Sequence, residues 1–80
     1  MRYRMDDNTV LDSENASQSW QAGDTWLHRS RRGRYWLEHT ASLPVARAEW
    51  VGHHRACAWL LEHSLEVPEE LKEYADEIIE

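Results

Sequence analysis

Histidine and cysteine are the residues of this chain best suited to metal binding or nucleophilic catalysis. His53 and Cys57 stand one helical turn apart, with His54 adjacent. A zinc site needs three or four ligands, and no Cys-x-x-Cys or His-x-x-x-His pair completes one. Cys57 falls in the apolar stripe of an expected helix, where cysteine is a small hydrophobe rather than an exposed thiolate. His28 and His39 are interpreted as ordinary strand residues. With no enzyme signature or cofactor loop, we predict no catalytic residues, no metal and no cofactor.

Arginine and aromatic side chains concentrate in HRSRRGRYW, residues 28–36. Basic residues interleaved with aromatic rings are typical of nucleic-acid-binding ribbons. Arginines at a hairpin tip are also commonly just solvated, and they discourage edge pairing. The candidate secondary interface comprises Trp26, Trp36, Arg29, Arg31, Arg32 and Arg34.

Acidic residues dominate the C-terminal segment. Residues 62–80 carry a net charge of −7, against +4 for residues 25–61 and −3 for residues 1–24. As one helix, residues 69–80 would space six acids at one charge per ~2.8 Å, over a ~120° arc. Duplex DNA carries one charge per ~1.7 Å, and a single strand one per ~3.4 Å. This face is either a solvated helix surface or a docking surface for a basic partner. The candidate partner-binding residues are Glu66, Glu69, Glu70, Glu73, Asp76, Glu77 and Glu80.

The 80 residues predict a single domain, 1–80. We expect an irregular N-terminal segment over 1–24, in which Tyr3, Met5, Val10 and Leu11 supply one short strand and 12–20 is turn-like. Residues 25–40 predict a β-hairpin with a three-residue loop, where Gly33 takes the left-handed conformation. That loop pairs Leu27 with Leu37, whereas a one-residue slip would place Leu27 opposite Glu38.

Residues 46–51 alternate as a third strand, after a connection over 40–46 that contains Pro44. The apolar spacing predicts helices over 53–65 and 67–80, the second beginning near Pro68. Region 25–51 is therefore a hairpin plus a third strand, and region 53–80 two helices. The predicted class is α+β: a small antiparallel sheet of three or four strands with two C-terminal helices packed on one face.

Five tryptophans are many for a core of this size. In one interpretation Trp20 and Trp50 complete the core, and the N-terminal segment covers the remaining tryptophan side chains. In the other, Trp26 and Trp36 form a homodimer seam or a partner interface, where tryptophan concentrates binding energy.

The segments RRGRYWLEH, ACAWLLEH and PEELKEYADEIIE, from within residues 25–80, resemble parts of small proteins of bacteria, phages and plasmids. In size, acidity and layout the chain also resembles anti-CRISPR proteins. The resemblance implies a role that many of those proteins have, which is to occupy a nucleic-acid-binding surface of a CRISPR effector.

The sequence thus leads to two functional hypotheses. The first is a non-enzymatic inhibitor, monomer or homodimer, that docks its acidic face on a basic CRISPR effector subunit. The alternative is a small nucleic-acid-binding regulator that uses the hairpin arginines at 29–34. The single cysteine, the charged N-terminus and the lack of an apolar run predict a cytoplasmic protein without a membrane span.

Overall fold

Two tight turns organise the central sheet of this protein, whose computed structural model describes residues 1–40 and 47–79. The strands are β1 (Arg2–Arg4), β2 (Val10–Asp12), β3 (Gln18–Ala22), β4 (Thr25–Arg29), β5 (Tyr35–His39) and β6 (Arg47–Val51). The helices are α1 (His53–Glu62), α2 (Lys72–Ile78) and two short 3₁₀ helices, Ser13–Asn15 and Glu69–Leu71. Together they confirm the α+β class. No helix within the described ranges is long and apolar enough to cross a membrane.

The predicted hairpin is formed by β4 and β5 in the predicted register. Leu27 lies opposite Leu37 and Arg29 opposite Tyr35. Gly33 has φ +83°, and its N–H donates to Ser30 O over 3.0 Å to close the loop. The predicted third strand is confirmed as β6, which pairs with β5. Residues 41–46, with Pro44 and the rest of the expected connection after Thr40, lie outside the described residues.

The fourth strand of this sheet is β3, in a stretch whose first part we predicted to be a polar turn. It pairs with β4 through a two-residue turn, in which Gly23 takes φ +59°. The sheet order is β3-β4-β5-β6, antiparallel throughout. Polar strand residues such as Gln18 and Gln21 are exposed at this edge, so no hydrophobic alternation marks the strand in the sequence.

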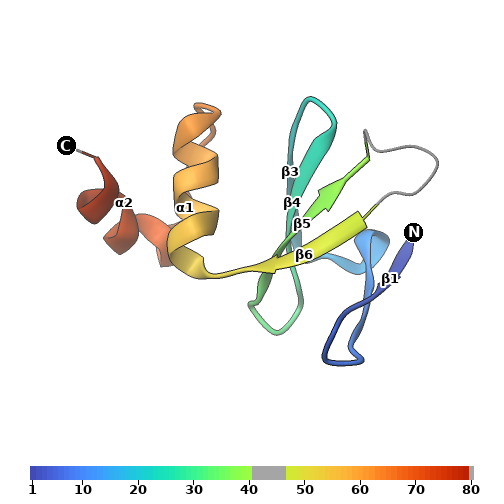
Figure 1. Ribbon diagram of the computed structural model, residues 1–80. Helices are drawn as coiled ribbons and strands as arrows, with labels where there is room; N and C mark the ends of the chain where they lie inside the picture. Colours follow the sequence, from blue (N-terminus) through green and yellow to red (C-terminus); the bar gives the residue numbers. More distant parts are fainter. Residues whose placement is uncertain (41–46, 80) are drawn as a thin grey trace.

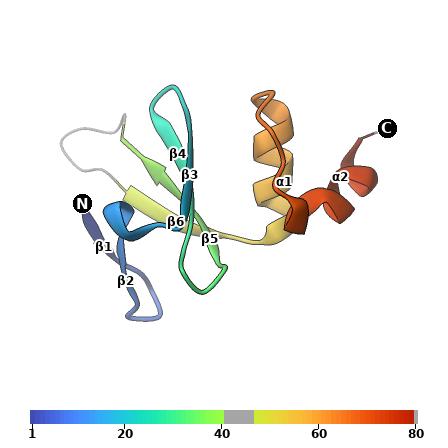
Figure 2. The same cartoon turned by 180° about the vertical axis from the view of Figure 1, so that it is seen from behind.

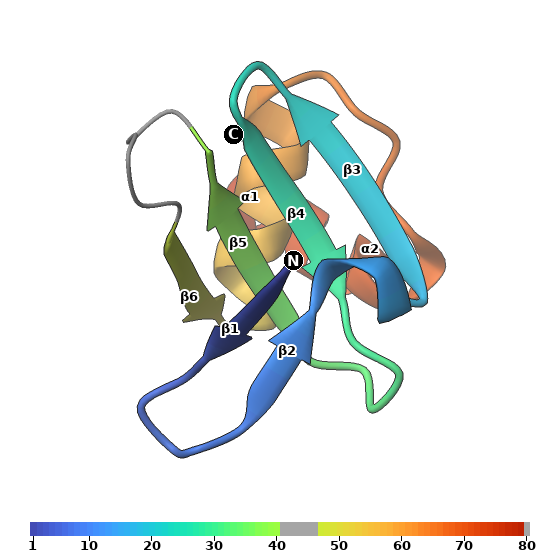
Figure 3. The ribbon, with the colours of Figure 1, turned by 90° about the vertical axis from the view of Figure 1, so that its right-hand side faces the viewer.

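The N-terminal segment is more ordered than the sequence predicted. The prediction of one strand was wrong, because β1 and β2 form a separate antiparallel hairpin. Asn8 makes its turn possible by taking φ +68°, and Met5 N–H donates to Thr9 O over 2.8 Å. This hairpin lies in front of the four-stranded sheet, and the helices lie behind it (Figure 3).

Both helices lie on one side of the sheet, with α2 beyond α1 (Figures 1 and 2). Helix α1 ends at Glu62, short of the predicted 65, where Ser64 turns the chain at φ +57°. The second helix does not span 67–80 as predicted. Pro68 caps the 3₁₀ helix Glu69–Leu71, and only Lys72–Ile78 is α-helical.

Two apolar clusters form on opposite faces of the sheet. The helix-side cluster comprises Leu27, Tyr35, Leu37, Val51, Ala56, Cys57, Trp59, Leu60 and Leu71. The second cluster is Met5, Leu11 and Trp36, between the sheet and the N-terminal hairpin. Trp36 is 1% exposed there, so within this chain its ring packs inside the second cluster. Trp20 packs against the first cluster and Trp50 against the second, as the core interpretation predicted.

We expect Gly33→Ala to destabilise the fold by about 1–2 kcal/mol, because a side chain with a Cβ is unfavourable in the left-handed region. The added Cβ would also lie 3.2 Å from Nη2 of Arg29. Gly52→Ser is the control, since Gly52 caps α1 at φ −75° and a Cβ there meets no atom within 4 Å. Urea denaturation should show a lower free energy of unfolding for Gly33→Ala than for wild type, and no decrease for Gly52→Ser. Equal losses would contradict this account of the turn.

Candidate functional site

Five exposed carboxylates follow one another in the C-terminal part of the described chain, from the loop after α1 to helix α2. We call this set the acidic C-terminal surface: Glu66, Glu69, Glu73, Asp76 and Glu77. Helix α2 directs its acids outward because Tyr74, Ala75 and Ile78 pack against the helix-side cluster. In residues 1–40 and 47–79, the one ion pair these carboxylates make is Glu69–Lys72, at 3.0 Å. Glu80, also predicted to belong here, lies outside the described residues.

Glu70 is the predicted acidic residue that the structure separates from this surface. Its Oε1 accepts from Nε of Arg29 over 2.5 Å, and its Oε2 accepts from Nη2 over 3.2 Å. The hydroxyl of Tyr35 also donates to Oε1 of Glu70. The 3₁₀ helix buries neighbouring Leu71 completely and turns Glu70 toward the sheet. The hydrogen bonds from Arg29 and Tyr35 lower the pKa of Glu70.

The hairpin arginines do not form one continuous surface. Arg29 is held by Glu70, on the side of the helices. The guanidinium of Arg34 lies 3.5 Å from the centroid of the Trp50 ring and 3.4 Å from a carboxylate oxygen of Asp7. Arg31 and Arg32 are exposed and make no ion pair with any described residue. Of the four hairpin arginines, these two have no acidic partner among the described residues.

An open cavity of about 240 Å³ lies at the tip of the hairpin. It is lined by Thr9, Leu11, Ser30, Arg31, Arg32, Arg34 and Trp50. Trp26, the other predicted interface residue, is partly buried on the sheet and stacks on His28. The predicted secondary interface is therefore divided among the helix side, the sheet face and this tip.

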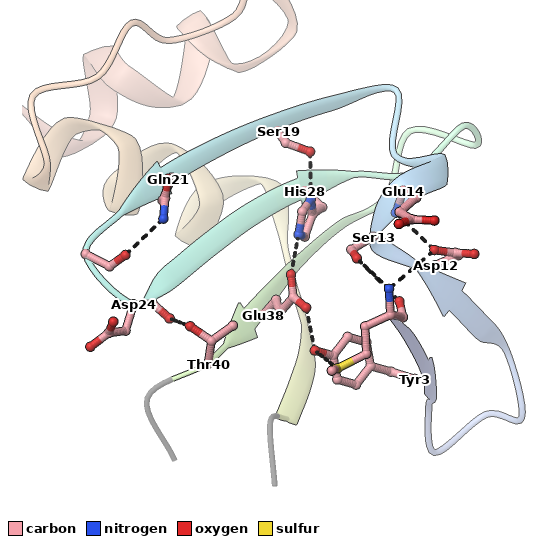
Figure 4. Close-up of polar contacts among 12 residues, drawn as sticks. Tyr3, Asp12, Ser13, Glu14, Ser19, Gln21, Asp24, His28, Glu38 and Thr40 are labelled. Atoms are coloured by element: carbon pink, nitrogen blue, oxygen red, sulfur yellow. Dashed lines mark hydrogen bonds and ion pairs between the residues drawn. The ribbon is translucent and has the colours of Figure 1, made fainter. Parts of the chain in front are cut away.

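A chain of buried polar groups crosses the sheet face beneath the N-terminal hairpin (Figure 4). The hydroxyl of Tyr3 donates to Oε2 of Glu38. Oε1 of Glu38 lies 2.9 Å from Nε2 of His28, and Nδ1 of His28 lies 2.7 Å from Oγ of Ser19. The His28 and Glu38 side chains are only 4% and 8% exposed. Burial and the bond to Glu38 raise the pKa of Tyr3.

The sequence did not predict this series of hydrogen bonds. His28 was interpreted as an ordinary strand residue, without hydrogen-bond partners. The register alone places His28 and Glu38 on the same face of neighbouring strands. Ser19 and Tyr3 come from β3 and β1, two strands that the sequence did not predict separately. The pair could have been found from the hairpin, but the four-residue chain could not.

The remaining candidate metal ligands are dispersed. Cys57 is fully buried in the core, and burial raises the pKa of its thiol. Nε2 of His53 lies 3.2 Å from the carbonyl oxygen of Gly33. No group of three His, Cys, Asp or Glu in the described ranges is arranged to hold a metal ion.

Comparison with known proteins adds no family to these observations. The chain matches no protein-family model, and no curated protein or solved structure is significantly similar to it.

Glu70→Gln should make stability less dependent on pH in the acid range. The folded state lowers the pKa of Glu70 below its ordinary 4.5, so the unfolded state binds the proton first. The resulting stabilisation is present above pH 4.5 and is lost as the pH falls through the lowered pKa. The Glu70 side chain is 39% exposed, so solvent screening limits the effect to about 1 kcal/mol or less.

The matched control is Glu73→Gln, which removes an exposed carboxylate from the adjoining helix α2 that has no contact with Arg29. Urea midpoints measured from pH 7 to pH 3 should fall less steeply for Glu70→Gln than for wild type or the control. Parallel curves for all three proteins would contradict the assigned role of Glu70.

Proposed function

We propose that this protein is a non-enzymatic binding protein that docks its acidic C-terminal surface on a basic surface of a nucleic-acid-binding protein. The observation that carries the proposal is the near-absence of compensating cations. Of the five exposed carboxylates, Glu69 alone has a cationic partner, Lys72, within the described chain.

The spacing of these charges is unfavourable for the helix itself. Glu73 stands three residues before Asp76 and four before Glu77, so like charges are neighbours on α2. Each such pair destabilises a helix by about 0.2–0.5 kcal/mol. A surface selected only for stability would alternate acids with lysine or arginine. The retained repulsion is relieved when a cationic partner binds, which favours a docking role over a purely solvated face.

Arg29 is not available as a counter-charge for these outward acids. It pairs with Glu70, and among the described residues Lys72 is the one cation that pairs with the acidic C-terminal surface. A basic groove built to hold a nucleic-acid strand has the complementary potential. Electrostatic steering would make the association fast and strongly dependent on salt.

The specific form of the proposal is inhibition of a CRISPR effector subunit in the cytoplasm. Its support is the resemblance to anti-CRISPR proteins in size, acidity and layout. An inhibitor of this kind would occupy the groove that otherwise holds guide or target strands.

The second candidate function is direct nucleic-acid binding through the hairpin tip. Arg31 and Arg32 project from the loop beside the open cavity, and this observation favours it. Two free arginines provide a small electrostatic contribution, because binding affinity follows the number of phosphates neutralised. The net charge of −6 opposes that contribution.

The proposal is tested by affinity capture from a nuclease-treated bacterial lysate that contains CRISPR effectors. The variant to compare with wild type is Glu73→Lys/Asp76→Lys/Glu77→Lys, which leaves Glu70 and its bonds intact. Arg31→Ser/Arg32→Ser is the control for the hairpin tip. We expect wild type and control to capture one basic subunit in near-stoichiometric amount, and the reversed variant to bind it at least tenfold more weakly.

Equal capture by the charge-reversed variant would exclude the acidic surface as the docking site. Capture that depends on leaving out the nuclease, and on Arg31 and Arg32, would support the second function instead.

A further inference from the structure

The buried polar chain ends at a solvent-exposed hydroxyl. Ser19 lies on β3, an edge strand of the sheet, and is exposed, whereas His28 and Glu38 behind it are buried. We propose that Ser19 is a nucleophile activated by His28, and that it accepts acyl groups from activated esters. The site lies on the sheet face opposite the helices and does not depend on the proposed docking function.

The hydrogen bonds give the chain a direction. A carboxylate only accepts hydrogen bonds, so Glu38 in that form takes the Tyr3 hydroxyl on Oε2 and, from the His28 tautomer with its proton on Nε2, an N–H on Oε1. With its proton on Nε2, neutral His28 presents an unprotonated Nδ1. That nitrogen accepts the Ser19 hydroxyl over 2.7 Å, a distance suited to general-base catalysis. Ser19 and His28 are the reacting pair, and Glu38 and Tyr3 are positioning residues.

The imidazole of His28 is held in place by rings from two strands. The Trp26 ring is nearly parallel to it, with centroids 5.8 Å apart, and the Trp36 ring lies at 4.4 Å. The groups that face it are Ser19 from β3, Trp26 from β4, and Trp36 and Glu38 from β5. Tyr3 from β1 reaches Glu38 rather than the ring. A clamped base loses little orientational freedom when it takes the proton.

The acylation step balances without an oxidant or reductant. Oγ of Ser19 bonds to the carbonyl carbon of the ester as its proton passes to Nδ1 of His28. The bond from that carbon to the leaving oxygen then breaks, and the released alcohol takes the proton from Nδ1. The products are a Ser19 ester, the free alcohol and neutral His28. Because a phenolate leaves readily, the site is expected to favour esters with such leaving groups.

The test is acetylation of the whole chain by p-nitrophenyl acetate, followed by an acid quench and peptide mapping of the acetyl group. Ser17 is the internal control because its hydroxyl is directed at the carbonyl oxygens of Arg29 and Ser30 and its Oγ accepts from Nη1 of Arg29 over 3.0 Å, so no base contacts it. We expect Ser19 to react about 100-fold faster than Ser17, at the lower end of general-base effects.

Two variants distinguish nucleophilic reactivity of Ser19 from a purely structural role for the buried hydrogen bonds. Ser19→Ala changes an exposed hydroxyl and should remove the fast acetylation without altering tryptophan fluorescence. His28→Asn should bring Ser19 down to the Ser17 rate. If that variant does not fold, the ratio of the Ser19 rate to the Ser17 rate in wild type decides the question. Acetylation confined to Lys72 and the N-terminal amine, with Ser19 no faster than Ser17, would overturn the proposal.

Discussion

The register of the β4–β5 hairpin is the constraint on which the rest of the structure depends. Gly33 permits the three-residue loop, and the loop places Leu27 opposite Leu37. Because side chains alternate along a strand, this pairing also places His28 and Glu38 on the opposite face. A slip of β5 by one residue would bring the Glu38 carboxylate to the face that packs against the helices. The same turn therefore determines which residues form the helix-side core. It also determines which residues form the hydrogen-bonded polar series and the surface on which the N-terminal hairpin packs.

Charge in this protein is unevenly distributed along the sequence, with a basic stretch over 25–61 between two acidic ones. The Arg29–Glu70 pair is the described ion pair that links the sheet to the C-terminal helical segment, and it is bidentate. Its formation positions the 3₁₀ helix and leaves the other acids facing solvent. The basic tip and the acidic C-terminal surface are thus connected through one internal pair. Each retains a net charge of its own, and this separation underlies the proposed docking function.

The sequence was most informative where apolar residues dictated the pattern. Hydrophobic matching predicted the register of the hairpin, and alternation predicted β6. Hydrophobic pattern did not predict the strands that are rich in polar residues. Strand β3 is held by its turn and by pairing with β4, and the N-terminal hairpin is held by packing on Trp36. Helical periodicity placed Glu70 among the outward acids, because a helical wheel contains no information about Arg29, 41 residues away. The Ser19–His28–Glu38–Tyr3 chain joins four strands, so only tertiary structure brings it together.

We propose that this protein binds its partner through the acidic C-terminal surface and not through the hairpin tip. Amide NMR spectra of the labelled protein, titrated in parallel with an arginine-rich peptide and with a short single-stranded DNA at physiological salt, test it most directly. We predict that the peptide shifts resonances of Glu66, Glu69, Glu73, Asp76 and Glu77, and that DNA leaves the spectrum unchanged. Shifts at Arg31 and Arg32 with DNA, and none at the acids with the peptide, would contradict the claim.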